Sequence, residues 1–284
     1  MTLSHKLRAA AGNASGGGIV TTGLAQYWDF GDLNCYNTGV SATAITDLSG
    51  AGNHGYFLSS TQPTYYSANG GYIQNTGSNQ FAQKGISASS SAPSAQSFLR
   101  NIGTGNFTIE FWVDIWGSSG NFLYSDGSQE VSFSPYFQFN FYSQNIIVSN
   151  QTMSGTGFTG TTNAYNVNIT NGTSGASPPS VALDNPYSYP TTNLHHGWQH
   201  LVFTRTSTGT NGFKVYKNNT LVSTHTNPIN YYMPQLPSGY ITDVTQYFDH
   251  LNSRFAIFRF YTTHGFTASD VARNYNAEKA RFGL

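Results

Sequence analysis

The chain has 284 residues, 8% of them charged, and its 12 basic residues balance 12 acidic ones. This composition argues against nucleic acid as a main partner, because phosphate neutralisation needs clustered lysine and arginine. The 19 tyrosines and 20 phenylalanines supply apolar surface for a core, while the polarity comes from uncharged residues. Such a neutral, hydrogen-bonding surface suits sugars or other protein subunits. The length fits one large domain.

Cys35 is the only cysteine, so an intrachain disulfide and a cysteine-based metal site are excluded. No apolar run reaches membrane-spanning length, and we expect no membrane insertion. The N-terminus lacks the apolar centre of a signal peptide. We therefore expect a protein made in a cytoplasm without classical export.

Residues 1–22 differ in composition from the rest. Leu3, Leu7 and Ala10 line one side of a short potential helix, and the glycine-rich residues 12–18 are typical of a flexible tether. Two interpretations stay open, a frayed terminus or a docking arm that inserts into a neighbouring subunit.

From residue 23 onward, short strands dominate. Apolar and polar residues alternate, or apolar residues cluster, in 26–30, 107–113, 137–141, 198–206, 212–217 and 254–261. In the second of these, Phe107, Ile109, Phe111 and Val113 are expected to face the core, with Trp112 on the other face. Asn218-Asn219 predicts a hairpin turn. Many short strands between turn residues predict an all-β, antiparallel β-sandwich.

One helix is predicted, at the C-terminal end. Thr267 is its expected N-cap and Asp270 completes a capping box, while Phe266 and Val271 are spaced for a hydrophobic staple. The helix is expected to end within residues 279–283.

Two polar segments interrupt the strand pattern. Residues 160–196 are rich in Thr, Asn, Gly and Pro, and we interpret them as a long insertion on one rim of the sandwich. Residues 228–247 form a second such segment, rich in tyrosine.

Four stretches, in the same order, resemble the laminin-G-like, concanavalin A-like lectin/glucanase superfamily. The first, within 28–55, includes Asp-Leu-Ser-Gly-Ala-Gly-Asn-His-Gly; the others are 106–113, 197–219 and 258–277. The resemblance implies an antiparallel jelly-roll β-sandwich over 23–284, with one short C-terminal helix behind the flexible N-terminal arm.

Residues 274–283 resemble the ends of such domains in bacteriophage virion proteins. The resemblance implies a non-enzymatic virion structural protein, an exposed capsid decoration or a tail- or fibre-associated component that binds host surface glycans. We expect a homo-oligomer that contacts other virion subunits through residues 1–22. The alternatives are a bacterial carbohydrate-binding module and, less favoured, a glycan hydrolase.

The acidic residues argue against hydrolysis. The chain has three glutamates, Glu110, Glu130 and Glu278, and none matches the superfamily's catalytic Glu-x-Asp-x-x-Glu strand. Glu110 and Asp114 share a strand face about 13 Å apart, too far for the two carboxylates of a glycosidase. We expect both to face solvent, and we assign no catalytic residue.

Candidate sugar-binding residues are tyrosines of the rim segments, because sugars stack on aromatic rings and bond to nearby amides and hydroxyls. They are Tyr165, Tyr187, Tyr189, Tyr231 and Tyr232. A role in subunit contacts remains an alternative for the same residues.

The resemblance also implies a calcium ion held between rim loops. Its candidate ligands are Asp29, Asp47 and Asn53, with Asp32 as a further option, since oxygen ligands suit a hard cation. The alternative for residues 47–50 is a simple Asx turn.

His195, His196 and His200 could in principle bind a metal as imidazoles. His200 falls in a predicted strand where a structural role is favoured.

Overall fold

In the computed structural model, the described residues form strands, short 3-10 turns and one C-terminal α-helix. The residues it describes are 18–39, 44–57, 63–75, 81–83, 105–115, 122–125, 130–133, 135–141, 144–154, 157–170, 180–182, 197–207, 209–225, 244–248 and 253–284.

The first sheet, sheet A, has eight antiparallel strands within these residues. Their order is β16-β15-β14-β7-β18-β5-β4, and β1 also pairs with β18. Its strands are β1 (Leu24–Asp29), β4 (Thr64–Tyr66), β5 (Tyr72–Asn75), β7 (Phe107–Ile115), β14 (Trp198–Arg205), β15 (Phe213–Lys217), β16 (Thr220–His225) and β18 (Ser253–Thr262).

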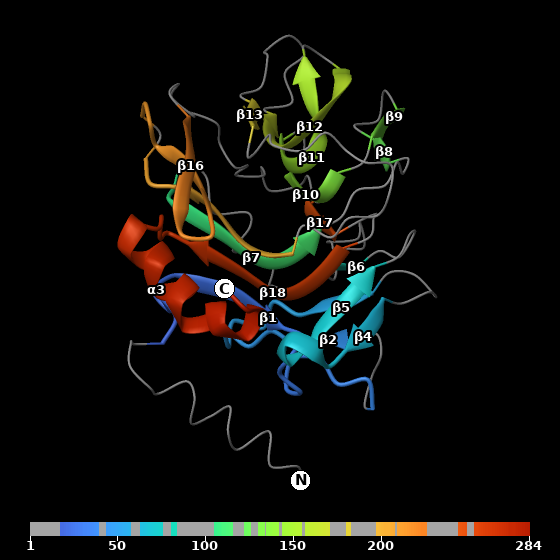
Figure 1. The fold of residues 1–284 in the computed structure, drawn as a ribbon, viewed down its shortest axis with the longest axis vertical. Coiled ribbons are helices and arrows are strands. Elements are labelled where there is room, and N and C mark those ends of the chain that lie inside the picture. Colours follow the sequence, from blue (N-terminus) through green and yellow to red (C-terminus); the bar gives the residue numbers. More distant parts are fainter. Residues whose placement is uncertain are drawn as a thin grey trace, which may run out of the picture.

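The second sheet, sheet B, also has eight described strands, in the order β13-β12-β11-β10-β17-β6-β3-β2. They are β2 (Ala44–Ile45), β3 (Gly55–Phe57), β6 (Phe81–Gln83), β10 (Pro135–Phe141), β11 (Gln144–Ser154), β12 (Gly157–Thr170), β13 (Ser180–Ala182) and β17 (Val244–Phe248). Strands β8 (Phe122–Ser125) and β9 (Glu130–Phe133) pair separately. The predicted all-β, antiparallel sandwich is confirmed, and Figure 1 shows its layers.

The core lies between the sheets and is largely aromatic. Phe111 of β7 packs against Phe203 and Phe258, and Trp28 of β1 lies 5.2 Å from Phe258, centroid to centroid. The ring of Trp28 also approaches β3 of sheet B so closely that a Cβ at Gly55 would lie 2.6 Å from it. The two sheets are therefore in direct contact at this point.

The C-terminal helix and its neighbour cover the outer face of sheet A. Helix α3 (Ala268–Glu278) begins with the predicted capping box, in which Thr267 Oγ1 accepts from the Asp270 backbone and Asp270 accepts from the Thr267 backbone. The 3-10 helix η3 (Lys279–Phe282) follows and ends at Gly283 in the left-handed region. A further 3-10 turn, η1 (Ala68–Gly70), joins β4 to β5.

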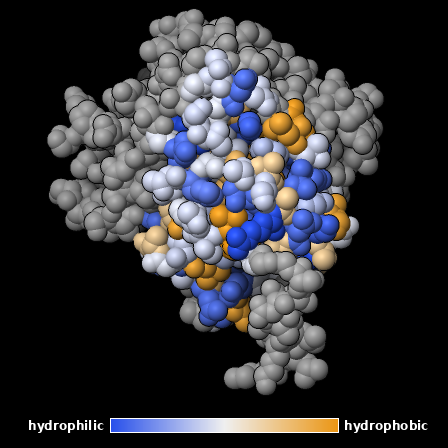
Figure 2. All heavy atoms as spheres, turned by 90° about the vertical axis from the view of Figure 1, so that its left-hand side faces the viewer, coloured by the Kyte–Doolittle hydropathy of each residue, from blue (hydrophilic) through white to orange (hydrophobic). Residues whose placement is uncertain are grey.

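Figure 2 views the molecule from the side on which α3 lies. Hydrophilic and neutral residues predominate there, and the apolar residues form small separate groups. The described part of this face therefore carries no broad apolar patch. Within the described ranges, no helix is long and apolar enough to cross a membrane.

The predicted Asn218-Asn219 turn agrees with the structure. Asn218 and Asn219 both have positive φ, 47° and 65°, as a two-residue hairpin turn between β15 and β16 requires. The two polar segments, in contrast, contain more strand than the sequence indicated. Residues 160–170 belong to β12 and 180–182 to β13, while 244–247 belong to β17.

The first described residues pack tightly onto the domain. Val20 is 3% exposed and joins a cluster with Tyr261, Phe266 and Val271. Its backbone N–H donates to Oδ1 of Asn274 in α3 at 2.7 Å. Residues 18–22 of the predicted arm are thus part of the domain surface and core, and residues 1–17 lie outside the described residues.

Candidate functional site

Strand β7 places its polar residues on the outer face of sheet A, where the sequence predicted exposure. That prediction was wrong: Glu110 is fully buried and Asp114 is 2% exposed. The reason is the C-terminal segment, which packs over β7. Trp112, on the same face, stacks on Phe282 of η3 at 4.3 Å and on Tyr275 of α3 at 5.8 Å, centroid to centroid.

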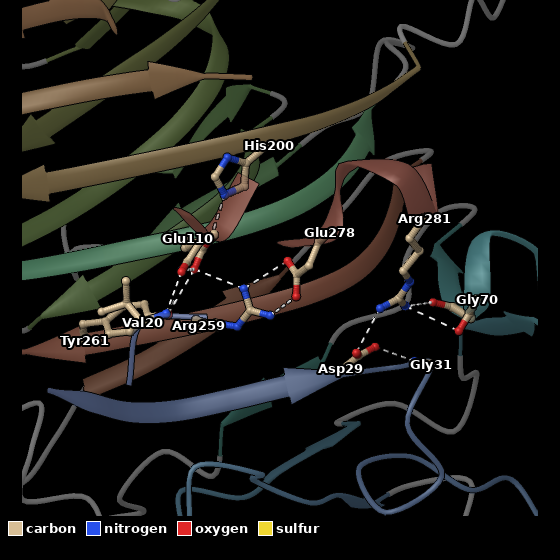
Figure 3. A network of polar contacts seen from close by, with 12 residues as sticks. Val20, Asp29, Gly31, Gly70, Glu110, His200, Arg259, Tyr261, Glu278 and Arg281 are labelled. Atoms are coloured by element: carbon tan, nitrogen blue, oxygen red, sulfur yellow. Dashed lines mark hydrogen bonds and ion pairs between the residues drawn. The ribbon is translucent and has the colours of Figure 1, made fainter. Parts of the chain in front are cut away.

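Glu110 is the centre of a buried polar network (Figure 3). Its Oε1 lies 2.6 Å from Nε2 of His200, so His200 has the structural role that was favoured over metal binding. Its Oε2 accepts from Nδ2 of Asn274 at 2.8 Å, from the hydroxyl of Tyr261 at 3.2 Å and from Nη1 of Arg259 at 3.3 Å. The carboxylate therefore has partners from β14, β18 and α3.

Arg259 joins Glu110 to a second carboxylate. Its Nη1 donates to Oε2 of Glu278 at 3.1 Å and its Nη2 to Oε1 of the same residue. The two glutamates thus share one guanidinium nitrogen. No sequence pattern indicated that they lie close together. Only the register of β7 with β18, and the path of α3 over both, brings them together.

Arg259 lies between this pair of carboxylates. A glycosidase holds its two acids on either side of an open sugar site. Here the space between them is filled by Arg259, whose side chain is fully buried, as is that of Glu110, while Glu278 is 13% exposed. The arrangement is that of an internal ion-pair network.

The electrostatics of the network follow from burial and from the shared cation. Burial alone would raise the pKa of Glu110, but the charge of Arg259 and the hydrogen bond from His200 outweigh it and lower the pKa to about 2. Burial raises the pKa of Glu278, and the charge of Arg259 offsets only part of this. Although burial disfavours its charge, Arg259 has a pKa well above its ordinary value because of Glu278, Tyr27 and Glu110.

Asp29, a candidate calcium ligand, is engaged by the C-terminal segment. Its Oδ2 accepts from Nη1 of Arg281 at 2.9 Å, and its Oδ1 accepts from the backbone of Gly31 at 2.8 Å. Arg281 also donates to the carbonyl oxygens of Asn69 and Gly71, each at 2.8 Å. A guanidinium therefore occupies the position beside Asp29 that a cation would need (Figure 3).

Asp47, the second candidate, organises the loop between β2 and β3. Its Oδ1 accepts from the backbone N–H of Tyr27 and Ser49, and its Oδ2 from the backbone of Asn53 and the hydroxyl of Ser49. Since these donors take up the carboxylate, the loop fits the Asx-turn alternative. Nδ2 of Asn53 donates to the carbonyl of Ala25 at 2.6 Å.

These residues do not fit a calcium site as they stand. The oxygen atoms of Asp29 and Asp47 face protein donors, and the two carboxylates belong to separate networks. In the described part of the chain, no group of three His, Cys, Asp or Glu residues is placed to hold a metal. Asp32 accepts from the backbone of Asn34 at its own turn. Calcium binding stays a prediction.

A different group of side chains lies at one end of sheet A. In register across the strands are Thr64, Gln74, Arg254, Asp114 and Trp198. Arg254 links this row, because its Nη1 donates to Asp114 at 3.2 Å and its Nε to Gln74 at 3.3 Å. We call these five residues the end row.

Both predicted sugar-binding segments join the sheet at this end. Strand β14 begins at Trp198, directly after residues 160–196, and β18 begins at Ser253, shortly after residues 228–247. Of the predicted tyrosines, Tyr165 is a residue of β12. The others, Tyr187, Tyr189, Tyr231 and Tyr232, lie outside the described residues, as do His195 and His196.

The sequence did not single out the end row. Its members come from five strands and become neighbours only through sheet register. The one available signal was positional, since Trp198 and Arg254 each follow a long polar segment.

Comparison with known proteins places the fold. No protein-family model matches the chain, and no curated protein matches its sequence. Solved structures do match it. The binding domain of botulinum neurotoxin DC, in complex with rat synaptotagmin II, aligns with a TM-score of 0.53 and 13% identity over 90% of this chain and 51% of that chain.

Two further matches have the same character. The ligand-binding domain of botulinum neurotoxin serotype D, in complex with N-acetylneuraminic acid, has a TM-score of 0.53 at 14% identity, over 91% of this chain and 52% of that chain. A Trypanosoma rangeli sialidase, bound to a difluorosialic acid, has a TM-score of 0.51 at 10% identity, over 95% of this chain and 35% of that chain. The chain spans about half the length of the toxin domains and about a third of the sialidase. At these identities the likeness concerns the fold alone, which is an antiparallel β-sandwich.

Proposed function

We propose that the protein is a non-enzymatic glycan-recognition protein exposed on a bacteriophage particle, as a capsid decoration or a tail- or fibre-associated component. One observation carries this proposal: the two ends of sheet A carry different features. The end row lies where the two long polar segments enter the sheet, and residues 18–20, from which the predicted arm extends, lie toward the other end.

Strand β18 shows how far the end row lies from the residues that follow the arm. Arg254 of the end row lies near its start, and Tyr261 lies near its finish, beside Val20. At about 3.3 Å per residue, this length of strand corresponds to roughly 20 Å. The carbonyl of Gly18 accepts from Nε of Arg273, which fixes the root of the arm against α3. An arm that docks at one end leaves the other end free for recognition.

The non-enzymatic part rests on the acidic residues. Four of the described acids are paired with arginine: Glu110 and Glu278 with Arg259, Asp29 with Arg281 and Asp114 with Arg254. A general acid needs access to the glycosidic oxygen, and these four carboxylates face arginine side chains.

Glycan recognition is supported by the neutral, tyrosine-rich composition and by the fold, which the chain shares with a toxin domain solved in complex with N-acetylneuraminic acid. The virion role is supported by the resemblance of residues 274–283 to phage virion proteins. In this chain Asn274, the first residue of that segment, bonds to Val20 and to Glu110 of β7.

Two experiments test the proposal. In the first, the full chain is applied to an array of bacterial surface glycans. The glycans that it binds are then incubated with the protein and assayed for newly formed reducing ends. Binding without reducing ends is expected; reducing ends that vanish in an acid-to-amide variant would overturn the non-enzymatic part.

In the second, particles purified from a culture of the encoding phage are analysed by quantitative mass spectrometry. The protein is expected at a fixed copy number relative to the major capsid protein. A variant lacking residues 1–17 is expected to fold but to be missing from particles. Absence of the full chain from particles would refute the virion role and leave glycan binding standing.

A further inference from the structure

Tyr66 is the one aromatic residue among the large hydrophobic side chains that are exposed in the described ranges. It is 40% exposed, at the edge of sheet A, whereas the other three are leucines. An exposed aromatic ring is a potential stacking surface, provided that it is held in place.

The ring of Tyr66 is held by the ring of Tyr72. The two residues are directly paired between β4 and β5, and their rings stack with centroids 5.2 Å apart and an angle of 18°. Tyr72 is only 5% exposed, so Tyr66 rests on a buried ring. An ordered ring loses little conformational freedom on binding.

Tyr72 is fixed in turn by members of the end row. Trp198 meets its ring edge-on, with centroids 5.4 Å apart, and the guanidinium carbon of Arg254 lies 5.3 Å from its centroid. The Tyr66 ring is therefore continuous with a packed group that reaches into β14 and β18.

Polar groups flank the ring on the same face. Thr64 and Gln74 are two residues from Tyr66 and Tyr72 on their respective strands, and they pair with each other. Same-face neighbours along a strand are about 7 Å apart, which is comparable to the width of one sugar ring. Thr64 is exposed and Gln74 half-buried.

The charge beside the ring is balanced. The side chain of Arg254 is 26% exposed, and its partner Asp114 is 2% exposed at 3.2 Å. Because it is paired with Asp114, the guanidinium presents no unpaired positive charge to attract an acidic sugar.

We infer that Tyr66 is a stacking platform for a neutral hexopyranose unit, with Thr64 and Gln74 bonding to its hydroxyl groups. The apolar face of the sugar covers the exposed face of the tyrosine ring. The inference rests on the proposed glycan-recognition function and assigns it a site. The platform lies toward the end of sheet A at which β14 and β18 begin, after residues 160–196 and 228–247.

The test uses saturation-transfer-difference NMR with methyl β-D-glucopyranoside and methyl β-D-galactopyranoside as probes, and N-acetylneuraminic acid as an acidic comparison. Full-length wild type is compared with Tyr66→Ala, Tyr66→Phe and Leu221→Ala. Leu221 is 47% exposed on β16, at the opposite edge of sheet A, and serves as the matched exposed control. Thermal unfolding verifies that each variant is folded.

We expect at least one neutral probe to bind. Tyr66→Ala is expected to weaken this binding by about tenfold, in line with the loss of one aromatic stack. Tyr66→Phe and Leu221→Ala are expected to remain within about threefold of wild type, and the acidic sugar to show no preference.

The outcomes separate the platform from the general function. If wild type binds glycans on the array but Tyr66→Ala binds them equally well, the platform is wrong and glycan recognition stands. If wild type binds neither the array nor the probes, both fail. A clear preference for N-acetylneuraminic acid would contradict the neutral-sugar assignment.

Discussion

The backbone N–H of Val20 donates to Oδ1 of Asn274 at 2.7 Å, across almost the whole length of the chain. The same amide donates through Nδ2 to Glu110 and to Tyr261. One side chain therefore connects the first described segment, the middle strand of sheet A and the last helix.

Replacing this amide should be costly. Asn274→Ala leaves a buried carboxylate oxygen and a backbone N–H without this partner, and we expect a loss of about 2–4 kcal/mol in unfolding free energy. Urea denaturation followed by circular dichroism measures it. Asn276→Ala, in the same helix but exposed, is the matched control and should change stability by less than about 0.5 kcal/mol. Equal effects of the two variants would contradict the role given to Asn274.

Stability should fall in acid through Glu110. Its pKa is lowered to about 2 in the folded protein from an ordinary value of 4.5, so its contribution is present above pH 4.5 and is lost as the pH falls toward 2. The full contribution is on the order of 3 kcal/mol.

The raised pKa of Glu278 acts in the opposite sense, but above pH 4.5, where its folded form retains a proton that the unfolded form loses. The measurement is unfolding free energy between pH 2 and 6 for wild type and Glu110→Gln. We expect the variant to be less stable and to have a flatter pH profile below pH 4.5. Parallel profiles would show that Glu110 does not carry the dependence.

The capping box of α3 gives a smaller, local prediction. Thr267→Ala removes the side-chain acceptor for the Asp270 N–H and should cost about 1 kcal/mol. Ser269→Ala, in the exposed first turn, is the control and should be close to neutral. Thermal unfolding compares them; identical melting temperatures for wild type and Thr267→Ala would argue against the cap.

The contact between the two sheets can be tested at Gly55. A Cβ there would lie 2.6 Å from the ring of Trp28, so Gly55→Ala should force the sheets apart and cost about 1–3 kcal/mol. Gly209→Ala is the control, because its added Cβ would lie an ordinary 3.8 Å from Oγ of Ser207. A neutral Gly55→Ala would mean that Trp28 can move away from β3.

The sequence predicted the elements of this fold better than their environment. Alternation in β7, the Asn218-Asn219 turn and the Thr267 cap are local patterns, and each appears in the structure as expected. The burial of Glu110 is different in kind. It depends on a helix that comes much later in the chain and covers a face which, from the strand pattern alone, looks solvent-facing.

The candidate site escaped prediction for a related reason. Tyr66, Arg254 and Trp198 lie on three strands, and no local pattern shows that they share an end of one sheet. Composition pointed to tyrosines in the polar segments, whereas Tyr66 sits in a three-residue strand with little periodicity to notice.

The separation between the arm root and the end row has a practical consequence for handling the protein. A sensor surface or bead coupled beside Gly18 would hold the protein next to α3, toward the end of sheet A away from Arg254. Tethering near Trp198 or Gln74 would instead shield the region under test. The position of coupling should therefore affect how much of the immobilised protein can bind glycans.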